Sequence, residues 1–564
     1  MKGTSHAAFA AALVGVAAIG ASPVLAQTTG TPNGKPQTLT PHKPHSRAPA
    51  SLLAPVQIAS DAKRGLTRAY TGTPIDVTQY HYDGNRTGWN PNETDLTPAA
   101  IQSGKFGLLA TLAVDGNVFG QPLLVSGLTL PDSSVHDVLI VATGNNSVYA
   151  FDAKTYAQLW KVNLGQQQST DDVGCHDVEK GYGISATPVI VRSGNTATIY
   201  LTAAIEPNRY EFHTMLHAID VGSGADVRPP VEINPSAKLS DRSVLKFDPQ
   251  NQWNRAGIAY GNGSLYIGIG SHCDNNAYGI SGWLLKYGTD LTSQASFHTI
   301  QTPHGYELAS IWMTGFAPAI DPSGNVFVVT GNGDFTHPGN DWGESVLKLT
   351  PALRVSSYFT PSGFADLNNG DTDFGSGGVM LVPHSAGQKG PDTAVAIGKS
   401  GILYLLNQRS LGGLTTGDTR ALQKIPLDHG VWGGPAYYSG STGPTVFEQG
   451  DGGALFSFGV TSTAQPVFLT KANGNSVGGY GGSLPIVSSN GAAPGTGVVW
   501  VVRRSAPIEL EAYDAEALGN PIYSANIGKW SNVGNNNPFL TAMEANGRVY
   551  VASYLTVNVF GLTQ

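Results

Sequence analysis

The sequence predicts an all-β protein, an eight-bladed β-propeller of four-stranded antiparallel blades, and three observations support this prediction. One pattern of short, β-branched segments recurs eight times along the chain. The chain holds 71 glycines among its 564 residues, well above the average share of about 7%. Only 13% of the residues are charged, against an average of about 25%. Many glycines and few charges favour short strands joined by tight turns.

The repeated pattern is clearest in its first copy. A small-residue and proline element at 120–124 is followed by strand-like segments at 138–142, 148–152 and 159–162. A spacing of roughly 50–70 residues between copies is typical of propeller blades with loop insertions. The alternative is a seven-bladed ring with one miscounted copy. The later copies open near Ser185, Ala256, Gly315, Gly377, Gly433, Gly481 and Pro538.

The last copy is incomplete. It offers strands at 539–544, 548–553 and 556–561, and then the sequence ends. A further strand-like segment, Phe106 to Val114, precedes the first full copy. We expect this segment to supply the missing outer strand, because a closed ring leaves no exposed sheet edge.

The N-terminal residues have the composition of a targeting segment. Lys2 precedes an apolar stretch at 7–19, and Val24 and Ala26 stand where a signal peptidase would cut before Gln27. We therefore expect a signal peptide at 1–26 and a periplasmic or secreted protein. No other apolar run is long enough to predict a membrane span.

The rest of the chain divides into two parts by composition. Residues 27–78 are rich in Thr, Pro, Ser and Ala, which predicts a flexible tether. Residues 79–564 form the predicted propeller. The net charge of −8 argues against nucleic acid as a partner, because phosphate binding needs basic patches.

Residues 150–155, followed by Trp160, resemble the tryptophan-docking repeat of the quinoprotein alcohol dehydrogenase-like propellers. Tyr156 stands where that family favours glycine, and 218–220 and 512–514 are partial matches. The resemblance implies a dehydrogenase that uses pyrroloquinoline quinone (PQQ) and calcium to oxidise an alcohol or sugar hydroxyl. The partners would be a small-molecule substrate and a separate electron acceptor, because no haem-binding Cys-x-x-Cys-His motif is present.

The segment 398–407 is the clearest match to the family's cofactor site. It is similar to the family's basic-x-Gly-x-x-Tyr-x-Leu-Asp pattern, whose cation contacts the quinone oxygens. The resemblance gives Lys399 a catalytic and cofactor-binding role, since a fixed ammonium stabilises negative charge on the reduced ring. A turn lysine that points to water is the alternative.

Segments 330–333 and 338–342 are similar to the family's Gly-Asn and Pro-Gly-Asp-Asn pair. The resemblance makes Asn332 a calcium ligand. The family's aspartate falls on Asn340, so Asp341 would act as base and metal ligand only after a shift of one residue. Carboxylate and amide oxygens suit Ca²⁺, but Asn, Asp and Gly are also ordinary turn formers.

Further candidates come from the second and third repeats. The resemblance places Trp283 beneath the planar quinone, although a tryptophan also suits the core. Glu206 or Glu211 would be the calcium-ligating glutamate. Ser185 and Thr187 would hold carboxylates of the cofactor.

The sequence has two cysteines, Cys175 and Cys273, each beside a histidine. In an oxidising compartment a disulfide between them is the favoured interpretation. A Cys₂His₂ metal site with His176 and His272 is the alternative.

Two other functions stay open. The chain is also similar to the non-catalytic quinoprotein-like subunit of outer-membrane assembly machines, a binding or scaffolding propeller in the cell envelope. The vicinal cysteine pair of the dehydrogenases is missing, which argues against bound PQQ. That subunit is normally lipid-anchored through a cysteine, and the predicted signal peptide has none, which argues against the scaffold. A propeller hydrolase or lyase acting on carbohydrate is the third possibility, without a paired-carboxylate signature.

Overall fold

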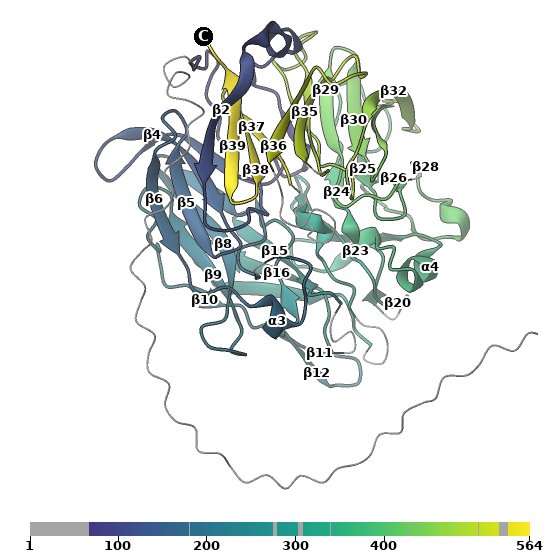
Figure 1. Cartoon of the computed structure of the whole chain (residues 1–564). Coiled ribbons are helices and arrows are strands. Elements are labelled where there is room, and N and C mark those ends of the chain that lie inside the picture. Colours follow the sequence, from purple (N-terminus) through teal and green to yellow (C-terminus); the bar gives the residue numbers. More distant parts are fainter. Residues whose placement is uncertain are drawn as a thin grey trace, which may run out of the picture. The chain divides into compact units, whose positions relative to one another are not determined.

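The structure is a computed structural model that describes residues 67–564 except 180, 275–278, 303–307, 339, 428, 506 and 529–539. The predicted signal peptide, and the predicted tether as far as residue 66, lie outside the described residues. Eight small sheets, each built from neighbouring antiparallel strands, follow one another around a ring (Figure 1). The predicted eight-bladed propeller is confirmed.

The first four blades follow one another along the chain. Their strands, in sheet order, are β3 (Leu123–Thr129), β4 (Val135–Ala142), β5 (Ser147–Asp152) and β6 (Gln158–Asn163) in blade 1; β7 (Val189–Ser193), β8 (Thr196–Ile205), β9 (His213–Asp220) and β10 (Val231–Glu232) in blade 2; β14 (Ala259–Gly261), β15 (Ser264–Ser271), β16 (Trp283–Gly288) and β17 (Ser293–His298) in blade 3; and β18 (Ala319–Ile320), β19 (Val326–Val329), β22 (Val346–Leu349) and β23 (Val355–Thr360) in blade 4.

The other four blades complete the ring. Their strands are β24 (Val379–Leu381), β25 (Thr393–Ala396), β26 (Ile402–Asn407) and β28 (Gln423–Pro426) in blade 5; β29 (Ala436–Gly440), β30 (Gly443–Gln449), β31 (Ala454–Val460) and β32 (Phe468–Val477) in blade 6; β33 (Ile486–Ser488), β34 (Val498–Arg503), β35 (Ile508–Asp514) and β36 (Tyr523–Gly528) in blade 7; and β37 (Met543–Ala545), β38 (Arg548–Ser553), β39 (Thr556–Leu562) and β2 (Phe106–Ala113) in blade 8.

Short elements decorate the blades. The added strands are β1 (Trp89–Asn90), β11 (Ser236–Lys238), β12 (Val244–Lys246), β13 (Gln252–Trp253), β20 (Phe335–Thr336), β21 (Asp341–Trp342) and β27 (Gly413–Leu414). The helical turns are α2 (Pro98–Ala100), η1 (Ile101–Lys105), α3 (Thr170–Val173), η2 (Met313–Gly315), α4 (Phe364–Asn369), η3 (Phe374–Ser376) and η4 (Thr416–Asp418). No helix among the described residues is long and apolar enough to cross a membrane.

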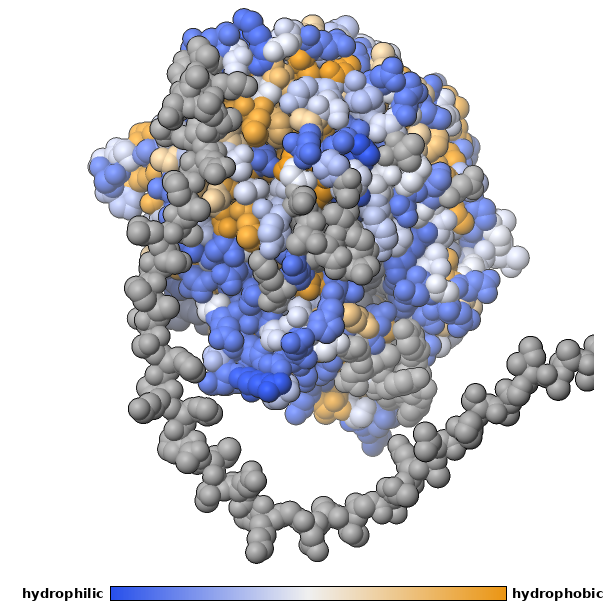
Figure 2. Space-filling model, in the orientation of Figure 1, coloured by the Kyte–Doolittle hydropathy of each residue, from blue (hydrophilic) through white to orange (hydrophobic). Residues whose placement is uncertain are grey.

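The middle strands of a blade pack against a neighbouring blade on both faces. All six residues of β5 are therefore buried, and so are the last six of β4, although an antiparallel strand with one wet face would alternate. The outer strand β6 is only half-buried. This is why the repeats are continuous apolar runs in the sequence. On the face shown in Figure 2, hydrophobic side chains form separate patches within a largely hydrophilic surface.

The ring closes with an N-terminal strand. β2 pairs antiparallel with β39, from Phe106 opposite Leu562 to Ala113 opposite Thr556, and the two strands lie side by side in Figure 1. The Phe106 ring packs 5.5 Å from that of Trp500 in blade 7. The predicted closure is confirmed: it removes the exposed edge of a three-stranded last blade.

Trp160 docks on the next blade, as the repeat predicts. Its indole Nε1 donates a hydrogen bond of 2.9 Å to the carbonyl oxygen of Val221 in blade 2. The indole also covers Gly224, where a Cβ would lie 2.7 Å from the ring. Gly224 has φ +74°, which favours glycine independently.

The segment 75–90 runs along the innermost strands. The backbone amides of Ile320 and Leu381, the last residues of β18 and β24, donate to Gly84 and Asn85, and Tyr437 donates to Thr87. The inter-blade loops enter at the start of these strands, so the segment closes the opposite end of the axis. Residues 67–78 of the predicted tether also contact the ring: Val77 is fully buried and pairs with Leu124.

Candidate functional site

A cavity of about 1020 Å³ lies at the loop-bearing end of the ring. Its walls come from two kinds of loop: those that join successive blades and those that connect the second and third strands within a blade. The first kind contributes Asp177, Trp312, Asp371, Asp373, Trp432 and Tyr480. The second kind contributes Ser271, Cys273, Asp274, Asn332 and Lys399.

Lys399 stands at the centre of an acidic cluster in this cavity. Its Nζ donates to Asp373 Oδ2 at 2.5 Å and to Asp371 Oδ1 at 3.1 Å. The Lys399 backbone N–H also donates to the carbonyl oxygen of Asp373 at 3.0 Å. The loop between β25 and β26 is thereby fastened to the inter-blade loop that carries both aspartates.

Asn332, in the loop between β19 and β22, connects the carboxylates. Its Nδ2 donates to Asp371 Oδ1 at 2.8 Å and lies 3.4 Å from Asp274 Oδ2. Its backbone N–H donates to Asp373 Oδ1 at 2.9 Å. The Asn332 side chain is 3% exposed, and its Oδ1 has no hydrogen-bond partner among the described residues.

Burial and the charge of Lys399 shift the pKa values of Asp371 and Asp373 in opposite directions. Burial outweighs the attraction of Lys399 for Asp373 and raises the pKa of that carboxyl above its ordinary value. Burial acts less on Asp371, and the Lys399 ammonium lowers the pKa of Asp371. The two carboxylates raise the pKa of Lys399 despite its burial, so this side chain stays charged.

Glu344 lies behind Asp373 and is fully buried. Its Oε2 accepts the backbone N–H of Phe374, the residue after Asp373, at 2.6 Å. Burial, and then the negative charge of Asp373, raises the pKa of Glu344 to about 9. At neutral pH this side chain is therefore an uncharged acid that fixes the loop next to Asp373.

Aromatic rings form much of the remaining wall. The Lys399 ammonium lies 5.7 Å from the centre of the Trp312 ring. Trp253 lines the side of the cavity near blade 3, and Trp432 and Tyr480 come from the loops before blades 6 and 7. A flat ligand in the cavity would therefore meet both an aromatic wall and the Lys399 cluster.

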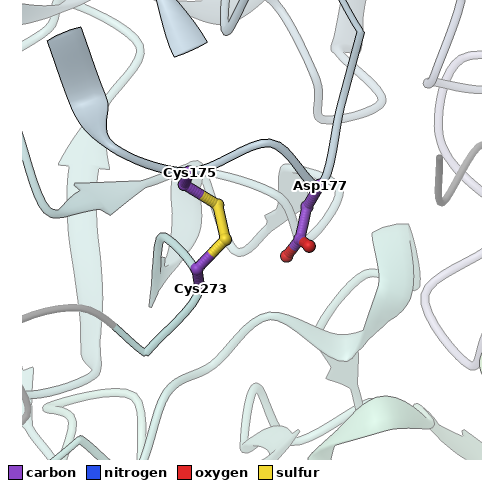
Figure 3. Close-up of side chains that lie close together, drawn as sticks. All are labelled: Cys175, Asp177 and Cys273. Carbon is purple, nitrogen blue, oxygen red and sulfur yellow. A yellow bond between two sulfur atoms is a disulfide. The ribbon is translucent and has the colours of Figure 1, made fainter. Parts of the chain in front are cut away.

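Cys175 and Cys273 form a disulfide with their Cα atoms 5.6 Å apart. The favoured prediction is confirmed, and the alternative Cys₂His₂ metal site is wrong because both thiols are consumed. The bond ties the loop before blade 2 to the second loop of blade 3. Figure 3 shows Asp177 beside this disulfide, and burial followed by the charge of Asp274 raises the pKa of Asp177.

Arg255 and Phe316 lie on the inner side of the cavity. Arg255 lines it and is 3% exposed, and its Nη1 donates to the carbonyl oxygen of Ser185 at 3.1 Å. Burial lowers the pKa of Arg255 to about 10, so it stays charged at neutral pH. Phe316 packs on the rings of Tyr80 and His81, at 5.1 and 5.0 Å, and so fills the axis below.

Two of the residues predicted from the sequence lie together in the cavity: Lys399 and Asn332. Asp341 does not line it. Its carboxylate accepts the backbone N–H groups of Gln301 and Thr302 at 2.7 and 2.8 Å and the Thr336 hydroxyl. Among the described residues, the hydrogen bonds of this carboxylate thus hold the loops around β21.

Trp283 does not line the cavity either. It begins β16, is fully buried within the core of blades 2 and 3, and packs against His298. Trp283 is therefore a core residue, as the alternative interpretation of this tryptophan predicts.

The remaining predicted residues also lie outside the cavity wall. Glu206 is buried and accepts the N–H groups of Ser169 and Tyr210, both at 2.8 Å. Glu211 is exposed and pairs with His213. Ser185 and Thr187 are both 1% exposed, and the Thr187 hydroxyl accepts from the Gln121 N–H at 2.9 Å.

The structure adds acids that the sequence analysis did not select. Asp371 and Asp373 lie directly before the fifth repeat, in an inter-blade loop of the kind that lines the cavity. The sequence feature that could have identified them is their position: two aspartates two residues apart, shortly before the fifth repeat begins. Asp177 and Asp274 stand close to the two cysteines in the sequence, two residues after Cys175 and directly after Cys273.

Comparison with known proteins gives a fold and no sequence family. No protein-family model matches the chain, and no curated protein matches it in sequence. Among solved structures, the quinohemoprotein alcohol dehydrogenase from Comamonas testosteroni superimposes with a TM-score of 0.54 at 14% identity. That match covers 86% of this chain and 80% of the other.

Two further solved structures match. A europium-containing methanol dehydrogenase has a TM-score of 0.56 at 12% identity, covering 89% of this chain and all of the other. BamB from Moraxella catarrhalis has a TM-score of 0.43 at 13% identity, covering 81% and 98%, a likeness too distant to bear on function. At these identities the first two matches establish a shared fold: this chain is an eight-bladed β-propeller built like the two dehydrogenases.

Proposed function

We propose that the protein is a PQQ- and metal-dependent dehydrogenase that oxidises a hydroxyl group of a small molecule. The observation that carries this proposal is the meeting of Lys399, Asp373, Asn332 and the Trp312 ring in one axial cavity. Two structures of the same fold are an alcohol and a methanol dehydrogenase. Fold alone does not define activity, so the proposal rests on the site.

The donor set fits a hard cation. Asp371 and Asp274 offer carboxylate oxygens from two loops, and rotation of the Asn332 amide would turn its Oδ1 toward them in place of Nδ2. Calcium takes six to eight such oxygen ligands. Asn332 Oδ1 is buried and lacks a partner among the described residues, which is costly unless it binds a ligand. A cation would also relieve the repulsion among the carboxylates.

The cavity also fits a flat, anionic quinone. The Trp312 face would provide apolar contact, while Lys399 and Arg255 would hold negative oxygens. When bound, the quinone would supply the acceptor for the hydride on the substrate's hydroxyl-bearing carbon. The protein's part is to orient both partners and to keep charge where it is needed.

Asp373 is the group that would accept the proton of the substrate hydroxyl. This assignment replaces Asp341, whose oxygens are occupied by the loops around β21. Burial raises the pKa of Asp373, which makes the carboxylate a better proton acceptor. Glu344 would hold the Asp373 loop through the Phe374 N–H, and Lys399 would stabilise negative charge on the acceptor.

We further propose that the protein is exported to the periplasm or beyond. The disulfide supports this, because disulfides persist in oxidising compartments and are rare in the cytosol. Electrons would leave to a separate acceptor, since the sequence has no haem motif.

A titration tests the proposal. Cofactor-free protein is titrated with PQQ, followed by absorbance, in the presence of Ca²⁺ or a trivalent lanthanide, and dye reduction is then measured with alcohols and sugars. Lys399→Met should weaken PQQ binding about 100-fold, since a hydrogen bond to a charged group is worth about 1.5–3 kcal/mol. Lys161→Met is the matched control, because Lys161 pairs with Asp115 in blade 1, outside the cavity wall.

Two outcomes would contradict the proposal. One is wild-type protein that binds neither PQQ nor the metal, which would favour the non-catalytic scaffold. The other is equal PQQ affinity in wild type and Lys399→Met, which would place the cofactor elsewhere.

A further inference from the structure

A glycine-rich loop presents one aromatic ring at the rim of the cavity. Residues 478–482 read Gly-Gly-Tyr-Gly-Gly, between blades 6 and 7. A Cβ at Gly479 would collide with the Arg504 carbonyl oxygen, and one at Gly482 with that of Gln449. Gly482 also has φ +79°. The backbone thus fits between the blades only as glycine, and Tyr480 is the one large side chain it carries.

Tyr480 stands beside Trp432 across the gap between the two loops. Their ring centres lie 5.5 Å apart with the planes tilted by 31°. The Trp432 backbone N–H donates to Gly481 at 3.0 Å, which fixes the two loops together. Tyr480 is 38% exposed and Trp432 is half-buried, so both rings reach the cavity and solvent.

The polar tips of these rings are available to a ligand. Neither the Tyr480 hydroxyl nor the Trp432 indole N–H has a hydrogen-bond partner among the described residues. An exposed tyrosine at a loop tip is unremarkable alone, but here the surrounding glycines place it on a wall that Trp432 continues. The pair is therefore a preformed aromatic surface with two free polar groups.

The rest of the lining limits what can lie on this surface. Eleven of the seventeen lining side chains are polar or charged, and Val178 is the one aliphatic side chain among the described residues of the wall. A long-chain alcohol would leave these polar groups unpaired. A sugar ring has one face of C–H groups that can stack on an aromatic ring and hydroxyls around its edge that can pair with Asn and Asp.

We infer that Trp432 and Tyr480 form a sugar-stacking subsite, so that the substrate is a pyranose or a short saccharide. This inference rests on the proposed function for the oxidation itself, but the binding of sugar does not require the quinone. The cavity of about 1020 Å³ is at the upper end of the range of roughly 300–1,000 Å³ for single-ligand sites. It has room for a flat cofactor and a sugar ring together.

Saturation-transfer NMR on the full chain, without and with PQQ and Ca²⁺, tests the inference. The probes are glucose, maltose and 1-hexanol. Wild type should bind the sugars in preference to hexanol. Tyr480→Ala should weaken sugar binding about tenfold, as expected for loss of one aromatic contact, while Tyr480→Phe keeps the ring and retains most of the affinity. The control is Tyr210→Ala, an exposed tyrosine of blade 2 that does not line the cavity.

The outcomes separate this inference from the proposed function. Sugar binding that depends on the Tyr480 ring, without PQQ binding, would support the subsite and overturn the dehydrogenase. PQQ binding with hexanol preferred over sugars, or with equal sugar affinity in wild type and Tyr480→Ala, would overturn the subsite alone. In the loaded protein, Tyr480→Ala should raise KM for sugars more than it lowers kcat.

Discussion

The two ends of the ring's axis are built around the same innermost strands but differ in chemistry. At one end, inter-blade loops bring Lys399, Asp371 and Asp373 to an open cavity. At the other, the segment 75–90 pairs with the innermost strands and closes the axis. The buried cation of this segment, Arg86, donates to the carbonyl oxygens of Pro318, Tyr80 and Asp83 and to the side chain of Gln79.

The two ends differ in the groups that pair with their buried cations, Arg86 and Lys399. Arg86 is fully buried, and most of its hydrogen bonds go to backbone groups that no ligand could replace. Lys399 is held by two carboxylates that also face open space, and Asn332 Oδ1 beside them has no partner among the described residues. A charge locked by backbone supports the fold, whereas a charge shared among cavity side chains can be rearranged around a ligand.

Asp373→Asn should give the largest effect at the cavity end. The amide cannot accept the substrate proton, so kcat should fall about 10²- to 10⁴-fold in the PQQ-loaded protein. In wild type, kcat/KM should rise with pH through the Asp373 pKa, which burial places above the ordinary carboxyl value, and this limb should vanish in the variant. Steady-state kinetics from pH 4 to 8 measure both. A variant with wild-type kcat would remove Asp373 from the reaction.

Arg86→Met should give the corresponding effect at the closed end, on stability instead of catalysis. It leaves several buried acceptors without a donor, so the free energy of unfolding should fall by about 3 kcal/mol, with PQQ affinity within about twofold of wild type. Urea denaturation and the absorbance titration measure the two quantities. Arg192→Met is the control, because Arg192 is only half-buried in its pair with Asp76. Unchanged stability of Arg86→Met, or loss of its PQQ binding, would contradict the conclusion that the closed end supports the fold and the cavity end binds the ligand.

The fold was predictable from the sequence because every blade needs the same pattern of short apolar strands joined by turns. Strands buried on both faces must be apolar throughout, so 138–142 and 148–152 are visible as runs, and closure by residues 106–114 follows from the incomplete last copy. The position of the disulfide was also predictable, since the sequence holds two cysteines and each has one possible partner.

The site was predictable only in part. Asn332 and Lys399 each follow the second strand of a blade, so the repeat places both in loops at the cavity end. Asp341 belongs to a longer insertion, and whether its carboxylate faces the cavity or caps Gln301 and Thr302 depends on the path of that loop in space. Asp373 reaches Lys399 because the loop after blade 4 folds inward, which no short-range pattern encodes.

Glu448→Gln leaves the cavity intact and tests the region between the two ends through the pH dependence of stability. Glu448 is fully buried at the end of β30; its Oε1 accepts the Gln449 N–H at 3.0 Å, and its Oε2 has no partner among the described residues. Burial raises the pKa of Glu448 to about 8 in the folded protein, against 4.5 for an ordinary glutamate. Between these values the unfolded chain releases a proton that the folded protein keeps, so the unfolded state gains stability as pH rises.

The free energy of unfolding should therefore fall between about pH 4.5 and 8, with Glu448 contributing at most about 1.4 kcal/mol per pH unit, and this contribution should level off above pH 8. Glu448→Gln should flatten that slope and be more stable than wild type at pH 8, because the amide stays neutral. Urea denaturation at several pH values measures the slope, with the exposed Glu211→Gln as control. Equal slopes in wild type and Glu448→Gln would mean that Glu448 ionises in the folded protein as easily as in water. A carboxylate would then be tolerated in the middle of the ring as well as at the cavity end.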